Sequence, residues 1–182
     1  MRREVARQGL HITFTSALAG VSIVVSQQVF LILCVSLLML LVWFVRARAE
    51  SAFFLHLMER DHDKQRFPGK GAIMVLCGAF LTGLLFPAHI LPALLVLGLG
   101  DSLSTLVGMR FGKKKLLNTN KSWIGSAAFL LVSCVILVWF SSWWLLIALV
   151  ATLAEIINYH RFLYLDDNLV IPLVVGLLLT LL

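Results

Sequence analysis

The sequence predicts an all-α integral membrane protein, a bundle of about seven transmembrane helices with a cytoplasmic N-terminus. Composition is the first reason, because the chain is 60% hydrophobic and 13% charged over 182 residues, whereas a soluble domain carries about 25% charged residues. Its mean hydropathy is +0.98. The second reason is that charged and uncharged connections alternate along the chain.

Seven apolar stretches are long enough, or nearly so, to cross about 30 Å of hydrocarbon at about 1.5 Å per residue. There is no internal repeat, so residues 1–182 are expected to form a single membrane-embedded domain. In order, the stretches are 10–26, 29–45, 72–86, 90–107, 123–140, 143–159 and 169–182.

The connections between these stretches set their orientation. Those after the first, third and fifth stretches are uncharged, namely Gln27-Gln28, Pro87-Ala88-His89 and Ser141-Ser142. The N-terminus and segments 46–70, 110–121 and 160–167 carry all 15 Lys and Arg. By the positive-inside rule these segments face the cytoplasm. The basic balance indicates anionic lipids and phosphates as partners, and not nucleic acid.

Asp101 lies in the fourth stretch, which is otherwise almost wholly apolar. An Asp at the centre of a membrane helix costs about 2.5 to 3.5 kcal/mol, so a chain that keeps one usually uses it. Helical spacing places Asp101 on one face with Ser104, Thr105 and Gly108. The predicted role is to hold a divalent cation between Asp101 and a bound phosphate, and the alternative is a structural role.

A basic loop follows this helix and suits a triphosphate. Gly108 and Gly112 permit close backbone approach or positive φ, and Lys113 to Lys115 supply charge. Lys121 and Ser122 stand at the start of the fifth stretch, where a helix N-terminus favours an anion. The alternative is a loop that only sets topology or contacts anionic lipid.

Two further polar stripes are expected to face the bundle. Glu155 is a second intramembrane carboxylate, on the face that also holds Ala148, Ala151, Thr152 and Asn158. The first stretch places Glu4, Arg7, Gln8, His11 and Thr15 on a single stripe. A Glu or His near a helix end is otherwise a snorkelling or capping group.

The seventh stretch begins with Asp166-Asp167-Asn168, which predicts a helix N-cap. Pro172 cannot donate to the carbonyl of Asn168, which leaves an acceptor at the level of Glu155. Carboxylate, amide and carbonyl oxygens together suit Mg²⁺ or a ribose hydroxyl. Residues 46–60 are expected either to form an amphipathic helix at the interface, beside a lateral lipid entrance, or to extend the second helix.

The order and spacing of these motifs resemble the CTP-dependent polyprenol kinase family, which includes dolichol kinase, phytol kinase and CTP-dependent diacylglycerol kinase. The match covers about the C-terminal half of the chain. Arg7 with His11 resembles the family's Arg-Lys-x-x-His start, although Gln8 replaces the usual Lys and Ile124 stands where Glu is common. The motifs are Gly100-Asp101-Ser102, Gly108-Met109-Arg110-Phe111-Gly112-Lys113, Lys121-Ser122-Trp123-Ile124-Gly125-Ser126, Glu155 and Asp167-Asn168-Leu169-Val170-Ile171-Pro172.

The resemblance implies that the γ-phosphoryl group of CTP is transferred to the hydroxyl of a membrane lipid, with Mg²⁺ as cofactor. Asp101 and Asp167 are then expected to hold metal, and Glu155 either to ligate metal or to accept the hydroxyl proton. Lys113, Lys115 and Lys121 are expected to bind phosphates, and Gly108, Gly112, Ser122, Gly125 and Asn168 to shape the nucleotide pocket. Arg7 and His11 are further candidates.

Two other functions fit parts of the pattern. A CDP-lipid synthase is the nearer one, because phosphatidate cytidylyltransferases carry a similar Gly-Asp and Lys-Ser signature, although the Asp-Asn-Leu-x-Ile-Pro ending favours the kinase. A transporter would use Asp101 and Glu155 to relay protons or ions. The sequence does not determine which lipid is the acceptor. It also leaves the oligomeric state open, with a homo-oligomer as one alternative.

Overall fold

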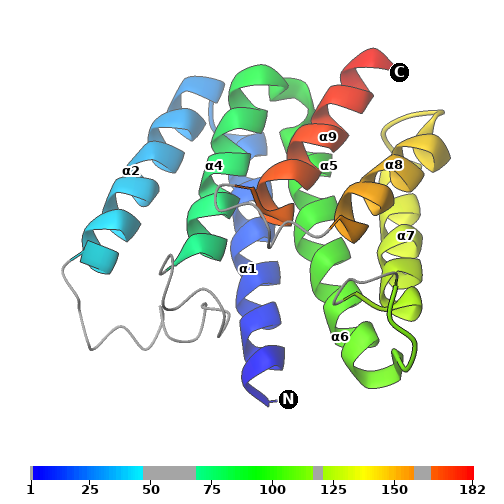
Figure 1. The fold of residues 1–182 in the computed structure, drawn as a ribbon. Coiled ribbons are helices and arrows are strands. Elements are labelled where there is room, and N and C mark those ends of the chain that lie inside the picture. The colour runs from blue at the N-terminus through cyan, green and yellow to red at the C-terminus, as the bar shows by residue number, and fades with distance from the viewer. Residues whose placement is uncertain (1, 47–68, 117–120, 158–164) are drawn as a thin grey trace.

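The computed structural model describes residues 2–46, 69–116, 121–157 and 165–182, and the regular elements within these ranges are all helices (Figure 1). The all-α class is therefore confirmed. Each of the seven apolar stretches forms a helix. The bounds are α1 Arg2–Val24, α2 Gln27–Arg46, α4 Lys70–Leu85, η1 Pro87–His89, α5 Ile90–Leu95, η2 Val96–Asp101, α6 Ser102–Phe111, α7 Trp123–Leu137, α8 Trp144–Ile156 and α9 Asp167–Leu181.

Polar side chains begin the helices that lead into the candidate site. Ser122 is the N-cap of α7, and its Oγ accepts a hydrogen bond from the backbone N of Gly125 at 3.1 Å. Asp166 is the N-cap of α9, and its Oδ1 accepts from the backbone N of Asn168 at 3.1 Å. Such caps satisfy N–H groups that have no partner inside the helix. The predicted cap before the seventh stretch is confirmed.

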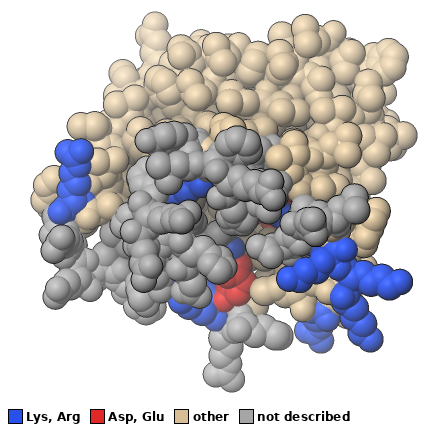
Figure 2. Space-filling model, viewed as in Figure 1, with Lys and Arg blue, Asp and Glu red and all other residues tan. Residues whose placement is uncertain are grey.

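Successive helices run in opposite directions, so most of the helix ends that border the charged segments lie toward one end of the bundle. In Figure 1 the N-terminus, the end of α2, the start of α4 and the end of α6 lie at the lower end, and the C-terminus lies at the upper end. Figure 2 shows Lys and Arg of this face in its middle and lower parts, and the upper part of the face has none. We call this lower end the charged end. α8 ends and α9 begins part-way along the bundle, above the charged end.

A central rod organises the packing. Elements η1, α5, η2 and α6 join end to end as a helical run of 25 residues, Pro87–Phe111, which contacts α1, α4, α7 and α9. Of the 18 consecutive residues of this run that are most apolar, 61% are buried, whereas only 11% are buried in the corresponding 18 residues of α2. α2 is therefore peripheral and packs mainly on α4.

The central rod changes from α-helical to π-helical hydrogen bonding in the segment that ends at Asp101. Val96–Asp101 is a π-helical turn, a feature that occurs often at functional sites. A Cβ atom on Gly98 would lie 1.9 Å from Oγ1 of Thr15, and one on Gly100 would lie 2.9 Å from the ring of Phe129. The two glycines thus let α1 and α7 approach this turn closely. Its π geometry was not predicted.

Two of the described helices are long and apolar enough to cross a membrane, judged by length and composition: Gln27–Arg46 and Pro87–Phe111. Four shorter helices are also apolar, namely Lys70–Leu85, Trp123–Leu137, Trp144–Ile156 and Asp167–Leu181. The interface helix expected for residues 46–60 lies, beyond Arg46, outside the described residues.

Candidate functional site

Lys121 is the centre of the candidate site, because three carboxylates from three different elements converge on its ammonium. Its Nζ lies 2.7 Å from Oε1 of Glu155, 3.3 Å from Oδ2 of Asp167 and 3.4 Å from Oδ1 of Asp101. These residues come from α8, α9 and the last position of η2. The structure thus brings together the three predicted catalytic carboxylates, and we call these four residues the Lys121 cluster.

The three carboxylates of the cluster are buried and the side chain of Lys121 is 24% exposed, so their charges are strongly interdependent. Asp101 is 2% exposed, Glu155 0% and Asp167 5%. Burial alone lowers the pKa of Lys121, but the charges of Asp167, Asp101 and Glu155, together with the hydrogen bond to Glu155, outweigh it and raise this pKa above its ordinary value. Lys121 therefore stays protonated wherever the carboxylates are ionised.

Glu155 has additional donors on both of its oxygens. Ser104 Oγ donates to Oε1 and Ser126 Oγ donates to Oε2, each at 3.0 Å. The predicted inward face of the sixth stretch is confirmed up to Glu155, and Asn158 lies outside the described residues. Neither serine had been assigned a role, although helical spacing had placed Ser104 on the inward face. Glu155 is satisfied by three donors, which suits it to hold Lys121 in place.

A cavity of about 310 Å³ opens beside the cluster, and Lys121 is part of its wall. Six of the eight predicted nucleotide-binding residues line it: Gly108, Gly112, Lys115, Lys121, Ser122 and Gly125. The lining also includes Ser104, Thr105 and Met109. Lys113 and Asn168, which had also been expected there, are not among its lining residues.

The cavity wall depends on close contact between α6 and α7. A Cβ atom on Gly112 would lie 2.3 Å from Oγ of Ser122, and one on Gly125 would lie 2.8 Å from the carbonyl oxygen of Ser104. Among the described glycines, positive φ occurs only at Gly69. Of the two roles expected for Gly108 and Gly112, close approach is therefore the correct one.

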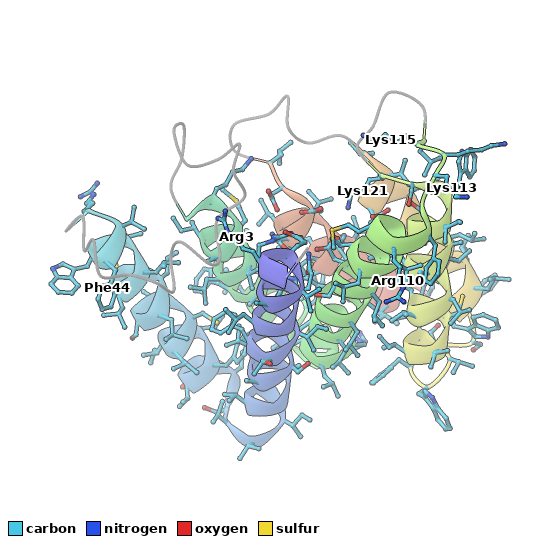
Figure 3. All side chains as sticks on the ribbon, turned by 90° about the horizontal axis from the view of Figure 1, so that it is seen from below. Arg3, Phe44, Arg110, Lys113, Lys115 and Lys121 are labelled. Carbon is cyan, nitrogen blue, oxygen red and sulfur yellow. The ribbon has the colours of Figure 1, made fainter. Side chains whose placement is uncertain are left out.

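The basic loop folds back along itself. Lys115 and Ser122 form an isolated antiparallel bridge, in which Trp123 N donates to Lys114 O at 3.3 Å. Figure 3, seen from the charged end, shows Lys113, Lys115 and Lys121 at the α6–α7 side of the molecule, with Phe44 at the far edge. Lys113, Lys114 and Lys115 are exposed, and the bridge brings Lys115 to the cavity.

The start of α9 holds a second buried ion pair that was not predicted. Lys70 Nζ lies 3.9 Å from Oδ2 of Asp166, and both side chains are under 10% exposed. Asn168 Nδ2 donates to Oδ1 of Asp166 at 2.8 Å. No motif spacing links Lys70 to Asp166, because the two residues are far apart in the chain and meet only through packing of α4 on α9.

The carbonyl of Asn168, which had been expected to serve a ligand, is packed against α4 instead. Its oxygen would lie 2.5 Å from a Cβ atom on Gly78. Pro172 does lie inside α9, so this carbonyl lacks the usual donor four residues further along the helix. The carbonyl oxygen of Asn168 therefore lies in the contact between α9 and α4. The side-chain Oδ1 of Asn168 is buried and has no hydrogen-bond partner in the described part of the chain.

The polar stripe on α1 lies beside the π turn. Arg7 forms an ion pair with Glu4, and Gln8 Nε2 donates to the same carboxylate at 2.9 Å. Ser102 Oγ donates to the backbone oxygen of Gln8 at 3.5 Å. The stripe is therefore next to Asp101, with Gln8 fully buried and His11 half-buried. Arg7 and His11 are not among the cavity lining residues.

The donor chemistry of the cluster fits Mg²⁺, which prefers carboxylate and other oxygen ligands. In the arrangement observed, no group of three or more His, Cys, Asp or Glu within the described ranges has metal-binding geometry. The reason is that the carboxylates of the cluster surround the ammonium of Lys121, at 2.7 to 3.4 Å from its Nζ. Asp101 and Asp167, the two predicted metal ligands, are the more distant of its three partners.

Similar proteins include two without an assigned activity. The uncharacterized protein MJ1137 of Methanocaldococcus jannaschii is 27% identical over 184 residues, which cover 97% of this chain and 93% of that protein. The uncharacterized protein RP860 of Rickettsia prowazekii is 30% identical over 131 residues, which cover 68% of this chain and 63% of that protein. No protein-family model matches the chain, and no solved structure matches it significantly.

Proposed function

We propose that this chain is a membrane-embedded lipid kinase of the CTP-dependent polyprenol kinase type. It would transfer the γ-phosphoryl group of CTP to the hydroxyl of a membrane lipid, a polyprenol, phytol or diacylglycerol. The observation that carries the proposal is the position of Lys121. This residue lines the cavity formed by the glycines and lysines of the motifs, and it also contacts Asp101, Glu155 and Asp167.

The cavity has the chemistry that a triphosphate requires. Lys115 and Lys121 bring positive charge to its wall, and Gly108, Gly112 and Gly125 bring the α6 and α7 backbones close to it. Phosphoryl transfer depends mainly on alignment and charge neutralisation, and less on covalent help from the protein. Lysines on one side and carboxylates on the other supply both. The preference for CTP rests on the family resemblance.

The reaction assigned to the site is an in-line displacement. The lipid hydroxyl oxygen forms a bond to the γ-phosphorus, the bond from that phosphorus to the bridging oxygen breaks, and CDP leaves. The hydroxyl proton passes to Glu155, the carboxylate of the Lys121 cluster that is not assigned to Mg²⁺. Asp101 and Asp167 would hold Mg²⁺, which neutralises phosphate charge when bound.

We further propose that the seven helical runs cross the membrane, with the charged end in the cytoplasm. Large exposed apolar side chains on the outer helices support this, because soluble monomers rarely expose extended apolar patches. Exposed Trp123 and Trp139 flank α7, as aromatic residues do at the two interfaces of a membrane. α7 and α8 are only 15 and 13 residues long, which implies local thinning of the bilayer.

The exposed basic residues beside the cavity are assigned to anionic lipid headgroups. Arg110, Lys113 and Lys114 are exposed at the end of α6 and do not line the cavity. Exposed Phe111 follows Arg110 in the chain, and the backbone N of exposed Trp123 donates to the carbonyl oxygen of Lys114 at 3.3 Å. A basic group beside interfacial aromatic side chains is typical of a surface that lies on acidic lipid.

The test is CDP release that depends on a lipid alcohol. Purified protein in detergent or nanodiscs is incubated with CTP and Mg²⁺, with and without phytol, dolichol or diacylglycerol, and the nucleotides are separated by chromatography. We expect CDP only when an alcohol acceptor is present. No CDP with any acceptor would contradict the proposal. Pyrophosphate release with phosphatidic acid would assign the chain to CDP-lipid synthesis.

A further inference from the structure

We propose that the ammonium of Lys121 occupies, in the unloaded protein, the place of a divalent cation, and that it leaves this place for the phosphates when nucleotide and metal bind together. The inference rests on the proposed function and extends it. Lys121 would then be both a phosphate ligand and a competitor for the cation. The consequence is that the protein binds a divalent cation weakly until a nucleotide arrives.

The first argument is the mismatch between the ammonium and its three partners. Charge-assisted hydrogen bonds from nitrogen to oxygen measure about 2.7–2.9 Å. The contact with Glu155 reaches this range at 2.7 Å, but those with Asp167 and Asp101 are longer, at 3.3 and 3.4 Å. One ammonium therefore serves one carboxylate well and two poorly.

The second argument is charge. Asp101 is 2% exposed, and Lys121 is its ion-pair partner; Glu155 is 0% exposed and shares the same ammonium. Ser104 and Ser126, the further donors to Glu155, are neutral. The three buried carboxylates of the cluster thus share one ammonium, and a buried charge without full compensation is costly. A divalent cation in place of the ammonium would supply one more positive charge and leave less of this charge uncompensated.

A third observation concerns the side chain of Asn168, the residue that follows Asp167 at the start of α9. This residue is 4% exposed, and its Oδ1 has no hydrogen-bond partner among the described residues. Its Nδ2 donates to Oδ1 of Asp166 and, at 3.5 Å, to the carbonyl oxygen of Gly71, which fixes the amide with Oδ1 directed away from both acceptors. A buried oxygen acceptor without a donor is the kind of group that a cation or its bound water satisfies.

The geometry explains why the cation is excluded while Lys121 is present. Mg²⁺ binds oxygens at about 2.0–2.1 Å and usually uses one or two carboxylates, with water and phosphate completing its shell. The carboxylate oxygens stand 2.7 to 3.4 Å from Nζ, so they must close in by about 1 Å once the ammonium leaves. Lys121 already lines the cavity, so its flexible side chain has a destination at the phosphates.

The experiment measures cation binding without nucleotide. Mn²⁺ replaces Mg²⁺ as the probe, and free Mn²⁺ is followed by electron paramagnetic resonance with the purified full chain in nanodiscs. We expect Lys121→Met to bind Mn²⁺ about tenfold or more tightly than the wild type, and we expect Lys121→Met with Asp101→Asn to lose this gain. Lys115→Met is the matched control, because it removes a cavity lysine outside the cluster, and it should bind Mn²⁺ as the wild type does.

A second measurement uses the wild-type chain and so does not depend on the folding of a variant. Acylation of Lys121 by a small amine-reactive reagent, read by mass spectrometry, should rise several-fold at saturating Mn²⁺, and acylation of Lys115 should not. Unchanged Mn²⁺ affinity in a folded Lys121→Met protein, or unchanged acylation, would overturn the inference even if the wild type releases CDP. A gain in Mn²⁺ affinity without any CDP release would instead keep the exchange and reject the kinase.

Discussion

Asp101 is the residue on which the proposed chemistry depends most. It ends the π turn, is almost fully buried, and its ion pair with Lys121 is long at 3.4 Å. We expect Asp101→Asn to lower the rate of transfer by at least about a hundredfold, because a metal ligand is lost without added bulk. The rate should be measured across a Mg²⁺ titration, and circular dichroism should show unchanged helix content. Normal turnover in this variant would return Asp101 to a structural role.

Two neighbouring lysines provide a matched pair for the nucleotide cavity. Lys115 lines the cavity and Lys114 does not, although both are exposed and adjacent in the chain. Lys115→Met is expected to weaken CTP binding by about tenfold, equivalent to about 1.4 kcal/mol, because it removes a phosphate contact. Lys114→Met should leave the affinity nearly unchanged. Equal losses in the two variants, measured by calorimetry, would show that only the overall charge of the loop matters.

At the residue scale, the sequence indicated which side chains matter better than what each one contacts. Asp101 and Glu155 were found because a carboxylate inside an apolar run has a high cost, and Asp167 was found through the motif Asp167-Asn168-Leu169-Val170-Ile171-Pro172. Their convergence on Lys121 was not foreseen, because pairwise contacts between α8, α9 and the basic loop leave no periodic signal. For the same reason the buried pair Lys70–Asp166 was missed.

The contact between α6 and α7 shapes the cavity, and substitution of a glycine in this contact tests that role. A Cβ atom on Gly125 would meet the carbonyl oxygen of Ser104 at 2.8 Å, whereas one on Gly20 has no neighbour within 4 Å. Gly125→Ala should cost about 1–3 kcal/mol of stability and weaken CTP binding, because the two helices must separate. Gly20→Ala, in α1, should be neutral or slightly stabilising. Thermal unfolding and CTP titration of both variants give the comparison, and a neutral Gly125→Ala would contradict the close contact.

Helices were predictable as elements because each is a long apolar run bounded by polar or charged residues. The caps at Ser122 and Asp166 could also be predicted, since Ser and Asp satisfy exposed N–H groups. The π turn at Val96–Asp101 could not, because the residues that pack against its glycines, Thr15 and Phe129, are distant in the chain. The packing of the Asn168 carbonyl against Gly78 of α4 could not be predicted for the same reason, because the two residues are distant in the chain.

Across the whole molecule, the charged segments should all lie on one side of the membrane. Lys114→Cys, at the charged end, and Ser142→Cys, in the connection between α7 and α8, can be introduced after removal of Cys34, Cys77 and Cys134. A membrane-impermeant maleimide should label the two positions from opposite sides, with Lys114→Cys on the cytoplasmic side. Labelling of both from the same side would show that the proposed seven crossings are wrong.

The fate of the labelled phosphorus tests the central claim most directly. The cavity can hold a triphosphate with its γ-phosphorus facing a lipid hydroxyl or with its α-phosphorus facing a lipid phosphate, and the two arrangements give different products. Purified protein with Mg²⁺ receives CTP labelled at either phosphorus, together with diacylglycerol, phytol, dolichol or phosphatidic acid. We predict that label enters lipid from γ-labelled CTP with an alcohol acceptor. Label that enters lipid only from α-labelled CTP, with phosphatidic acid as acceptor, would contradict the account.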